Sequence, residues 1–285
     1  MVQNTVSLTF ASTNTLLISD GKTHLIIDPH FTRPGFVGQN NLLGRISPSP
    51  ERIAYGLACL GVKSLDAVLL THTHYDHALD AAEVARMTGA CLVGSPSAEK
   101  IAIGAGLPKT NCQIAVERVP MKFGAFEVIF LRGAHISIPP LLPVIGMARE
   151  IKRPLTPPQF ASAYREGGTY AILLQYPPSI TILCMGSAGY FPNWLSGIQA
   201  QTVILPVGGL DFRGKAYRQM LFEQSVLAVD ARRLFFSHWD DFTRPLDAPP
   251  RMMPACRKAL IQLETLAAKA QISTARLKPW LSISL

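Results

Sequence analysis

Short apolar runs separated by turn-forming residues open the chain and predict β-strands. The first three runs span residues 6–10, 15–18 and 25–28. The Asp20–Gly21 pair between the second and third runs is typical of a hairpin turn. Later apolar runs predict further strands at residues 67–70, 92–93, 113–116, 126–130, 169–175, 180–184, 203–205 and 234–236.

Longer amphipathic segments alternate with these strands and predict helices. They span residues 51–60, 78–87, 97–103, 217–229 and 253–268. Leading strands followed by alternating strands and helices indicate an α/β protein with mixed sheets covered by helices. Because the chain shows no internal repeat and no clean linker, residues 1–285 are predicted to form a single domain.

A proline-rich insert loop at about 136–160 interrupts the alternation directly after His135. Long loops without secondary structure inside compact domains are usually functional. The loop is therefore interpreted as a lid or as an apolar wall of a substrate pocket, or alternatively as a loop packed on its own core or a dimer contact. The side chains suited to an apolar wall are Ile138, Leu141, Leu142, Val144, Ile145 and Met147.

The charge balance narrows the choice of ligands. Charged residues make up only 16% of the chain, yet the net charge is +8. A field of this sign attracts an anionic small molecule, an anionic membrane surface in peripheral contact, or nucleic acid. We do not expect a nucleic-acid partner, because the basic residues form no stripe interleaved with aromatic side chains. The composition excludes a disordered, collagen-like or coiled-coil protein, and the sequence leaves the oligomeric state open.

The cysteines and the chain start point to a cytoplasmic protein. Five cysteines are scattered without a CxxC pair, which is typical of reduced thiols. The first residues lack the basic and apolar regions of a signal peptide, and no run of about 18 uncharged apolar residues predicts a transmembrane helix.

The strongest chemical signal is a cluster of histidines and one aspartate at residues 71–77. His72, His74, Asp76 and His77 follow directly after a predicted buried strand. His72 and His74, two apart in extended backbone, can point the same way, while Asp76 and His77 can reach a second centre. Imidazole and carboxylate donors suit Zn²⁺, although manganese, iron or nickel also accept them. The cluster predicts a site for one or two metal ions.

This string matches HxHxDH, and the chain resembles the metallo-β-lactamase superfamily over nearly its whole length. The resemblance implies a four-layer αββα sandwich with two metals at its edge. The opening strands lead to a segment that looks like the family's start, and two later histidines look like its remaining ligands. The segments concerned are Ile27-Asp28-Pro29, Gly133-Ala134-His135 and Phe236-Ser237-His238.

Three weaker cues resemble one branch of that superfamily. They lie at residues 28–31, 166–170 and 206–209. The branch includes phospholipases D that hydrolyse N-acylphosphatidylethanolamine and ascorbate-6-phosphate lactonases.

The resemblance also implies a ligand set and a reaction. His72, His74 and His135 would hold the first metal, whereas Asp76, His77 and His238 would hold the second. The implied reaction is hydrolysis of an ester, lactone or phosphodiester by a metal-bound hydroxide. Asp76 would be the catalytic residue, orienting the nucleophile and carrying a proton. The positive charge favours an anionic substrate, and the apolar loop favours a partly apolar or lipid-like one.

One position departs from the family pattern. The family places a bridging aspartate in a glycine-rich loop that here reads Met185-Gly186-Ser187-Ala188-Gly189, so the matching residue is Ser187. A neutral hydroxyl is a poor metal ligand. The site is then dinuclear with a weaker second ion, or mononuclear, or degraded in a non-catalytic or regulatory binding protein. A third hypothesis, an RNA-processing nuclease, predicts binding that weakens steeply with salt.

Five further residues have two interpretations each. Asp28 either supports a histidine ligand or caps a turn, and His30 either lines the pocket or sits in a loop. Tyr75 either reaches the substrate or packs. Asp240 and Asp241 either replace the missing bridge or serve as caps or supports of ligands.

Overall fold

The computed structural model describes residues 5–137 and 149–285. The six apolar side chains predicted to form a substrate wall, between Ile138 and Met147, lie outside the described residues. The described chain builds two seven-stranded sheets and one small two-stranded sheet.

The first sheet has the strand order β16-β1-β2-β3-β5-β6-β7. Its first half is antiparallel, as the hairpin signal at Asp20–Gly21 predicts, and β3, β5, β6 and β7 run parallel. The strands are β1 (Ser7–Phe10), β2 (Leu16–Ser19), β3 (His24–Ile27), β5 (Ala67–Leu69), β6 (Cys91–Gly94), β7 (Cys112–Ile114) and β16 (Ser282–Ser284).

The second sheet has the strand order β15-β14-β13-β12-β11-β9-β8. Antiparallel pairs join β8, β9, β11 and β12, and parallel pairs join β12, β13, β14 and β15. The strands are β8 (Met121–Phe123), β9 (Phe126–Arg132), β11 (Tyr170–Tyr176), β12 (Ile180–Met185), β13 (Thr202–Pro206), β14 (Arg233–Ser237) and β15 (Ser273–Arg276). The small sheet pairs β4 (Arg45–Ile46) with β10 (Gln159–Phe160).

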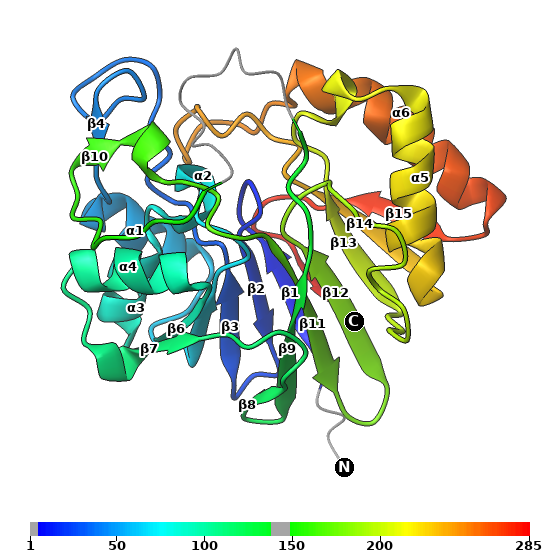
Figure 1. The fold of residues 1–285 in the computed structure, drawn as a ribbon, viewed down its shortest axis with the longest axis horizontal. Coiled ribbons are helices and arrows are strands. Elements are labelled where there is room, and N and C mark those ends of the chain that lie inside the picture. Colours follow the sequence, from blue (N-terminus) through cyan, green and yellow to red (C-terminus); the bar gives the residue numbers. More distant parts are fainter. Residues whose placement is uncertain (1–4, 138–148) are drawn as a thin grey trace.

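Helices cover the outer faces of both large sheets (Figure 1). On the first sheet, α1 and α4 each begin at a Ser-Pro pair. The hydroxyls of Ser49 and Ser95 accept hydrogen bonds from the backbone N–H of Arg52 and Ala98, which cap these helices. The helices are α1 (Pro50–Cys59), α2 (Tyr75–Ala78), α3 (Ala81–Thr88), α4 (Pro96–Gly104), α5 (Lys215–Ser225) and α6 (Arg257–Lys269).

Two hydrophobic clusters hold the layers together. The larger one fills the space between the sheets and includes Leu8, Phe130 and Ile172, all fully buried. The second lies between the first sheet and its helices and includes Ile26 and Ile53. Burial of this apolar area is the main stabilising term of the fold. The predicted α/β class and the four-layer αββα arrangement are confirmed, while the single-domain assignment stays a prediction.

Several element boundaries differ from those predicted. The segment at residues 72–77, for which no helix is predicted, ends in the helical turn α2, and α6 begins at Arg257 instead of 253. Strands β4, β8, β10, β15 and β16 have no counterpart in the sequence analysis, and β10 lies within the predicted insert loop at about 136–160. All four residues of β15 are exposed, so this edge strand lacks the apolar alternation that marks the others. No helix in the described ranges is long and apolar enough to span a bilayer.

Candidate metal centre

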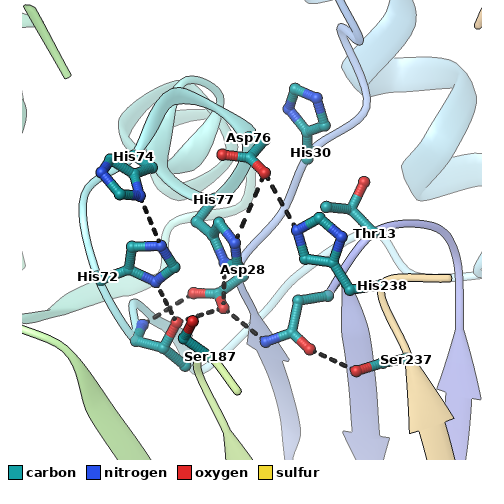
Figure 2. Close-up of polar contacts among 12 residues, drawn as sticks. Thr13, Asp28, His30, His72, His74, Asp76, His77, Ser187, Ser237 and His238 are labelled. Carbon is teal, nitrogen blue, oxygen red and sulfur yellow. Dashed lines mark hydrogen bonds and ion pairs between the residues drawn. The ribbon is translucent and has the colours of Figure 1, made fainter. Parts of the chain in front are cut away.

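The ends of three strands bring the predicted metal ligands together, and Figure 2 labels all of these ligands except His135. His72 and His74 follow β5, and Asp76 and His77 lie in the turn α2 that comes next. The other two ligands come from the second sheet, where His135 follows β9 and His238 follows β14. Segments separated by more than 160 residues in the sequence therefore meet at one edge of the sandwich, as Asp76 and His238 do.

Two triads of side chains form at this edge, and they consist of the residues that the family resemblance implied. One consists of His72, His74 and His135, and the other of Asp76, His77 and His238. Within each triad the ligand atoms lie within 4.8 Å of one another. The Nε2 of His72 is 3.1 Å from the Nδ1 of His74, and the Nε2 of His238 is 3.1 Å from the Oδ2 of Asp76.

The triads stand next to each other. The ring centroids of His72 and His77, which belong to different triads, are only 3.9 Å apart. All six side chains are buried or nearly so. Five imidazoles and a carboxylate packed this closely lose their hydration, and a bound cation would offset that loss.

Hydrogen bonds fix the ring orientation of two of the histidine ligands. His77 donates its Nδ1–H to the Oδ2 of Asp28 at 2.8 Å, so its Nε2 faces the second triad. His135 donates its Nδ1–H to the carbonyl oxygen of Ile136 at 2.8 Å. Such partners fix the tautomer and the orientation of a metal-binding imidazole.

The protonation states also suit a metal. Burial lowers the pKa of His72 well below its usual value, and burial lowers that of His135 too. Burial alone would raise the pKa of Asp76, but His77 and His238 hold it well below its usual range. For His77, burial works against the charged form, yet Asp28 and Asp76 raise its pKa. Neutral imidazoles and an ionised carboxylate are the forms that bind metal. His72, His135 and Asp76 favour these forms. His77 favours its protonated form and would release a proton on binding a divalent ion.

A cavity of about 220 Å³ opens beside the triads. Five of the six ligands line it, namely His74, Asp76, His77, His135 and His238. The remaining lining is mostly apolar. These side chains are Ile136, Ala188, Pro206, Phe212, Phe242 and Met253.

Known proteins resemble this chain in part of its sequence and in its fold. Residues 8–111 match the family model of the metallo-β-lactamase superfamily, and this stretch contains the HxHxDH segment. A solved structure of similar fold is that of Igni18, a metallo hydrolase of Ignicoccus hospitalis, with a TM-score of 0.61 at 16% identity. That alignment covers 99% of this chain and 98% of Igni18.

Two curated relatives match parts of the chain. A UPF0173 metal-dependent hydrolase of Christiangramia forsetii is 32% identical over 90 residues, which is 32% of this chain. One of Agrobacterium fabrum is 28% identical over 133 residues, 46% of this chain. The matches span only 32% and 49% of the relatives' own lengths. The resemblance to the phospholipase D and lactonase branch stays a prediction.

Ser187, the residue at the position where the family resemblance implies a bridging carboxylate, lines the cavity. Its hydroxyl oxygen accepts a hydrogen bond of 3.1 Å from the backbone N–H of Ile136. Asp76 is the only acidic residue among the described residues that line the cavity. The two triads therefore share no protein carboxylate in the described part of the chain.

Asp28 lies beneath the two triads as a buried acceptor. Its carboxylate accepts hydrogen bonds from the Thr71 N–H (2.8 Å), the Thr71 hydroxyl (2.5 Å), Asn14 Nδ2 (2.8 Å) and His77 Nδ1 (2.8 Å). Of its two predicted roles, the structure shows contact with a histidine ligand. The backbone φ of 46° places Asp28 in the left-handed region, a strained conformation typical of sites that orient a functional side chain.

Tyr75 and His30 lie behind the cavity wall. Neither residue lines the cavity, and both are buried. Their rings contact each other edge to face at 6.0 Å, and both contact Phe242. For Tyr75 the structure shows packing. The loop position predicted for His30 is observed, although its ring is fully buried and neither nitrogen has a hydrogen-bond partner in the described chain.

Asp240 and Asp241 are turned away from the triads. Asp240 is buried, accepts a 2.8 Å hydrogen bond from the Thr13 N–H and pairs with Arg33 at 3.0 Å. Asp241 accepts hydrogen bonds from the N–H and hydroxyl of Thr243. Neither lines the cavity, so the idea that one of them replaces the missing bridge is not supported. A local ion pair and a local cap satisfy these carboxylates instead.

The sequence analysis overlooked Asn14 and did not predict the close packing of Gly186 and Gly208. Asn14 donates to Asp28 and to the carbonyl oxygen of Met185, and accepts from the Ser237 hydroxyl, thereby joining both sheets under the site. A Cβ at Gly208 would lie 2.6 Å from His238 Nδ1, and one at Gly186 would lie 2.5 Å from the Thr71 Cβ. The polar run Ser12-Thr13-Asn14-Thr15 between two apolar strands was the available signal for Asn14.

Asp80, a fully buried residue just after α2, makes the stability of the fold depend on pH. Its buried carboxyl group accepts hydrogen bonds from the N–H groups of Phe31 and Thr32 and from the Thr32 hydroxyl. Burial, only partly offset by these bonds, raises the pKa of Asp80 from 3.8 to about 6. A raised carboxyl pKa adds stability below about pH 4, and this stability is lost as the pH rises through about 6.

We therefore expect the native protein to lose stability relative to Asp80→Asn between pH 4 and pH 7. A shift of about two pH units corresponds to roughly 3 kcal/mol at most. Urea unfolding of both metal-free proteins at the two pH values measures this difference. If the stability of the native protein relative to Asp80→Asn stayed constant or increased from pH 4 to pH 7, the expected burial penalty on the ionised carboxylate would be contradicted.

Proposed function

We propose that the chain is a metal-dependent hydrolase with a two-ion site. His72, His74 and His135 would hold one ion, and Asp76, His77 and His238 the other. The observation that carries this proposal is the pair of triads, each with ligand atoms within 4.8 Å of one another, side by side at an apolar cavity. The curated relatives named metal-dependent hydrolases support the same activity. Zn²⁺ is the proposed ion because it favours nitrogen and oxygen donors in small coordination shells.

The chain's own residues would position the reaction. Bound ions would supply Lewis-acid activation of water and of the oxygen on the scissile bond. The Asp76 carboxylate is ionised and lines the cavity, so it can orient the attacking water through a hydrogen bond and accept its proton. Asp28 holds His77 through its Nδ1–H, and Ile136 holds His135 in the same way. The apolar wall limits access of bulk water.

The charge of the site points to the substrate class. Two divalent ions would face a single carboxylate among the described lining residues, because Ser187 is neutral. A substrate oxygen with negative charge would compensate this deficit, which favours a phosphodiester or an ester or lactone with an anionic group. The apolar lining, including Phe212 and Phe242, suits a partly apolar or lipid-like small molecule. We further propose a cytoplasmic setting, in which the five free cysteines would stay reduced.

The neutral Ser187 favours a second candidate function, that of a binding or regulatory protein. Without a bridging carboxylate, the second ion would bind more weakly, and a protein that has lost one ion can serve as a binding or regulatory module on the same fold. The two functions differ in metal content and in turnover.

Metal content per chain tests the proposal. The native protein, purified without added metal or chelator, is compared with Ser187→Asp and screened with a nitrophenyl ester, a lactone and bis(nitrophenyl) phosphate. We expect about two equivalents of metal, or one rising to two in the variant, together with hydrolysis of at least one probe. Absence of metal after zinc has been supplied would rule out the hydrolase and favour the binding protein.

A further inference from the structure

A second cavity, of about 320 Å³, lies next to the loop that follows His238. Its lining comes from this loop, from Ala11 and Arg33, and from residues 278–280 near the end of the chain. None of its lining residues lines the metal cavity. Both cavities nevertheless share the loop, since Asp241 and Arg244 line the second cavity and Phe242 lines the first.

Positive charge gathers in the second cavity. Arg244, Arg251 and Lys278 line it together with one carboxylate, Asp241. None of these three basic side chains forms an ion pair in residues 5–137 and 149–285. Arg33 also contributes to the lining, but its charge is paired with Asp240. The cavity therefore presents an excess of unpaired positive charge, which attracts an anion.

Arg244 also carries an unpartnered donor. Its Nε atom is buried and has no hydrogen-bond partner in the described chain. A buried donor without a partner is unfavourable, and a guanidinium group pairs well with the oxygens of phosphate or carboxylate. Arg244 thus marks the place at which an anionic group would be held.

Two tryptophans, Trp239 and Trp280, also line this cavity. Trp239 is buried, and its Nε1–H donates to the carbonyl oxygen of Leu277 at 2.9 Å, which fixes the ring. Trp280 has a left-handed backbone with φ of 65°, held by a 2.7 Å hydrogen bond from its N–H to the Phe10 carbonyl oxygen. Non-glycine residues in this conformation persist only where the surrounding structure holds them, and they cluster at ligand sites.

We propose that this cavity binds a small anion that carries a flat ring system, of the nucleoside monophosphate class. The phosphate would pair with Arg244, Arg251 and Lys278, and the ring would stack against a tryptophan. The volume of about 320 Å³ lies at the lower end of small-ligand pockets, which span about 300–1,000 Å³. The proposal does not depend on hydrolysis at the metal centre, because the two cavities have no lining residue in common.

Titration of adenosine monophosphate (AMP) into the full chain tests the proposal, with tryptophan fluorescence and calorimetry as readouts. We expect saturable binding of one AMP per chain. Adenosine and inorganic phosphate, each lacking one half of the ligand, should bind at least about tenfold more weakly. Arg244→Gln and Lys278→Gln should each weaken AMP binding by a similar factor, whereas Lys122→Gln, an exposed basic residue on β8, should leave it unchanged.

The design separates the two cavities. Lys278 is exposed, so its substitution leaves the fold intact even if the half-buried Arg244 proves sensitive. His74→Ala should not change AMP binding, because His74 lines only the metal cavity. Absence of saturable AMP binding, or equal binding by native protein and both cavity variants, would overturn the proposal. If inorganic phosphate bound as tightly as AMP, the proposal that the ligand carries a ring system would be wrong.

Discussion

Asp76→Asn is expected to remove about one metal equivalent per chain and to reduce hydrolysis by about 10²–10⁴-fold. The carboxylate lies 3.1 Å from His238 Nε2 and 3.8 Å from His77 Nε2, so it is the charged member of its triad. Asparagine keeps the shape but supplies no negative charge to a cation and accepts no proton from water. Metal analysis and turnover of the probe that the native protein hydrolyses measure the two effects.

Two matched variants give this prediction its controls. His74→Ala should remove metal from the other triad, whereas Asp66→Asn should leave both metal content and turnover unchanged. Asp66 is an exposed aspartate that accepts a hydrogen bond from the His24 N–H, far from the triads along β3 and β5. Native metal content in Asp76→Asn would contradict the assignment of Asp76 as a ligand. If Asp76→Asn kept its full metal content but lost turnover, Asp76 would orient the water without being a metal ligand.

Asp28→Asn is expected to lower the free energy of unfolding by about 3–5 kcal/mol and to weaken metal binding by about 10–100-fold. The Asp28 carboxylate accepts four hydrogen bonds in a fully buried position, from Thr71, Asn14 and His77. Asparagine cannot accept all four, and the His77 ring loses the charged partner that orients it. Urea unfolding in chelator measures the stability, and competition with a metal-binding dye measures the affinity.

The second prediction separates a positioning role from a purely structural one. Asp20→Asn is the control, since Asp20 accepts backbone hydrogen bonds in a surface turn and should cost less than about 1 kcal/mol. Lower stability with unchanged metal affinity would reduce Asp28 to a structural residue. If Asp28→Asn were as stable as the native protein, a neutral side chain at this position would be enough to hold Thr71, Asn14 and His77.

Local pattern made much of the fold predictable. The core strands carry unbroken apolar runs, such as β11 and β13, and the Ser-Pro pairs mark the starts of α1 and α4. The edge strands β15 and β16 lack that signal, because exposed strands at a sheet edge have no buried face to encode. Their position depends on long-range contacts: β15 pairs with β14 and lies next to α6, while β16 pairs with β1 and packs Ile283 against the core.

The sequence by itself determined the α/β class and the central metal-binding segment. His72, His74, Asp76 and His77 are close in sequence, so their spacing alone predicts a joint site. The same spacing cannot show that Asp28 supports His77, that Asp240 pairs with Arg33 instead of joining the triads, or that Asn14 connects both sheets.

Only the tertiary structure decided these contacts and the second cavity. Arg33, Arg244 and Trp280 line one cavity although about 35 to more than 200 residues separate them. Contacts of this kind depend on the layered packing of the two sheets and on the loops that leave their edges. Local propensity and periodicity describe neighbours along the chain, whereas burial and charge compensation select partners across the whole fold.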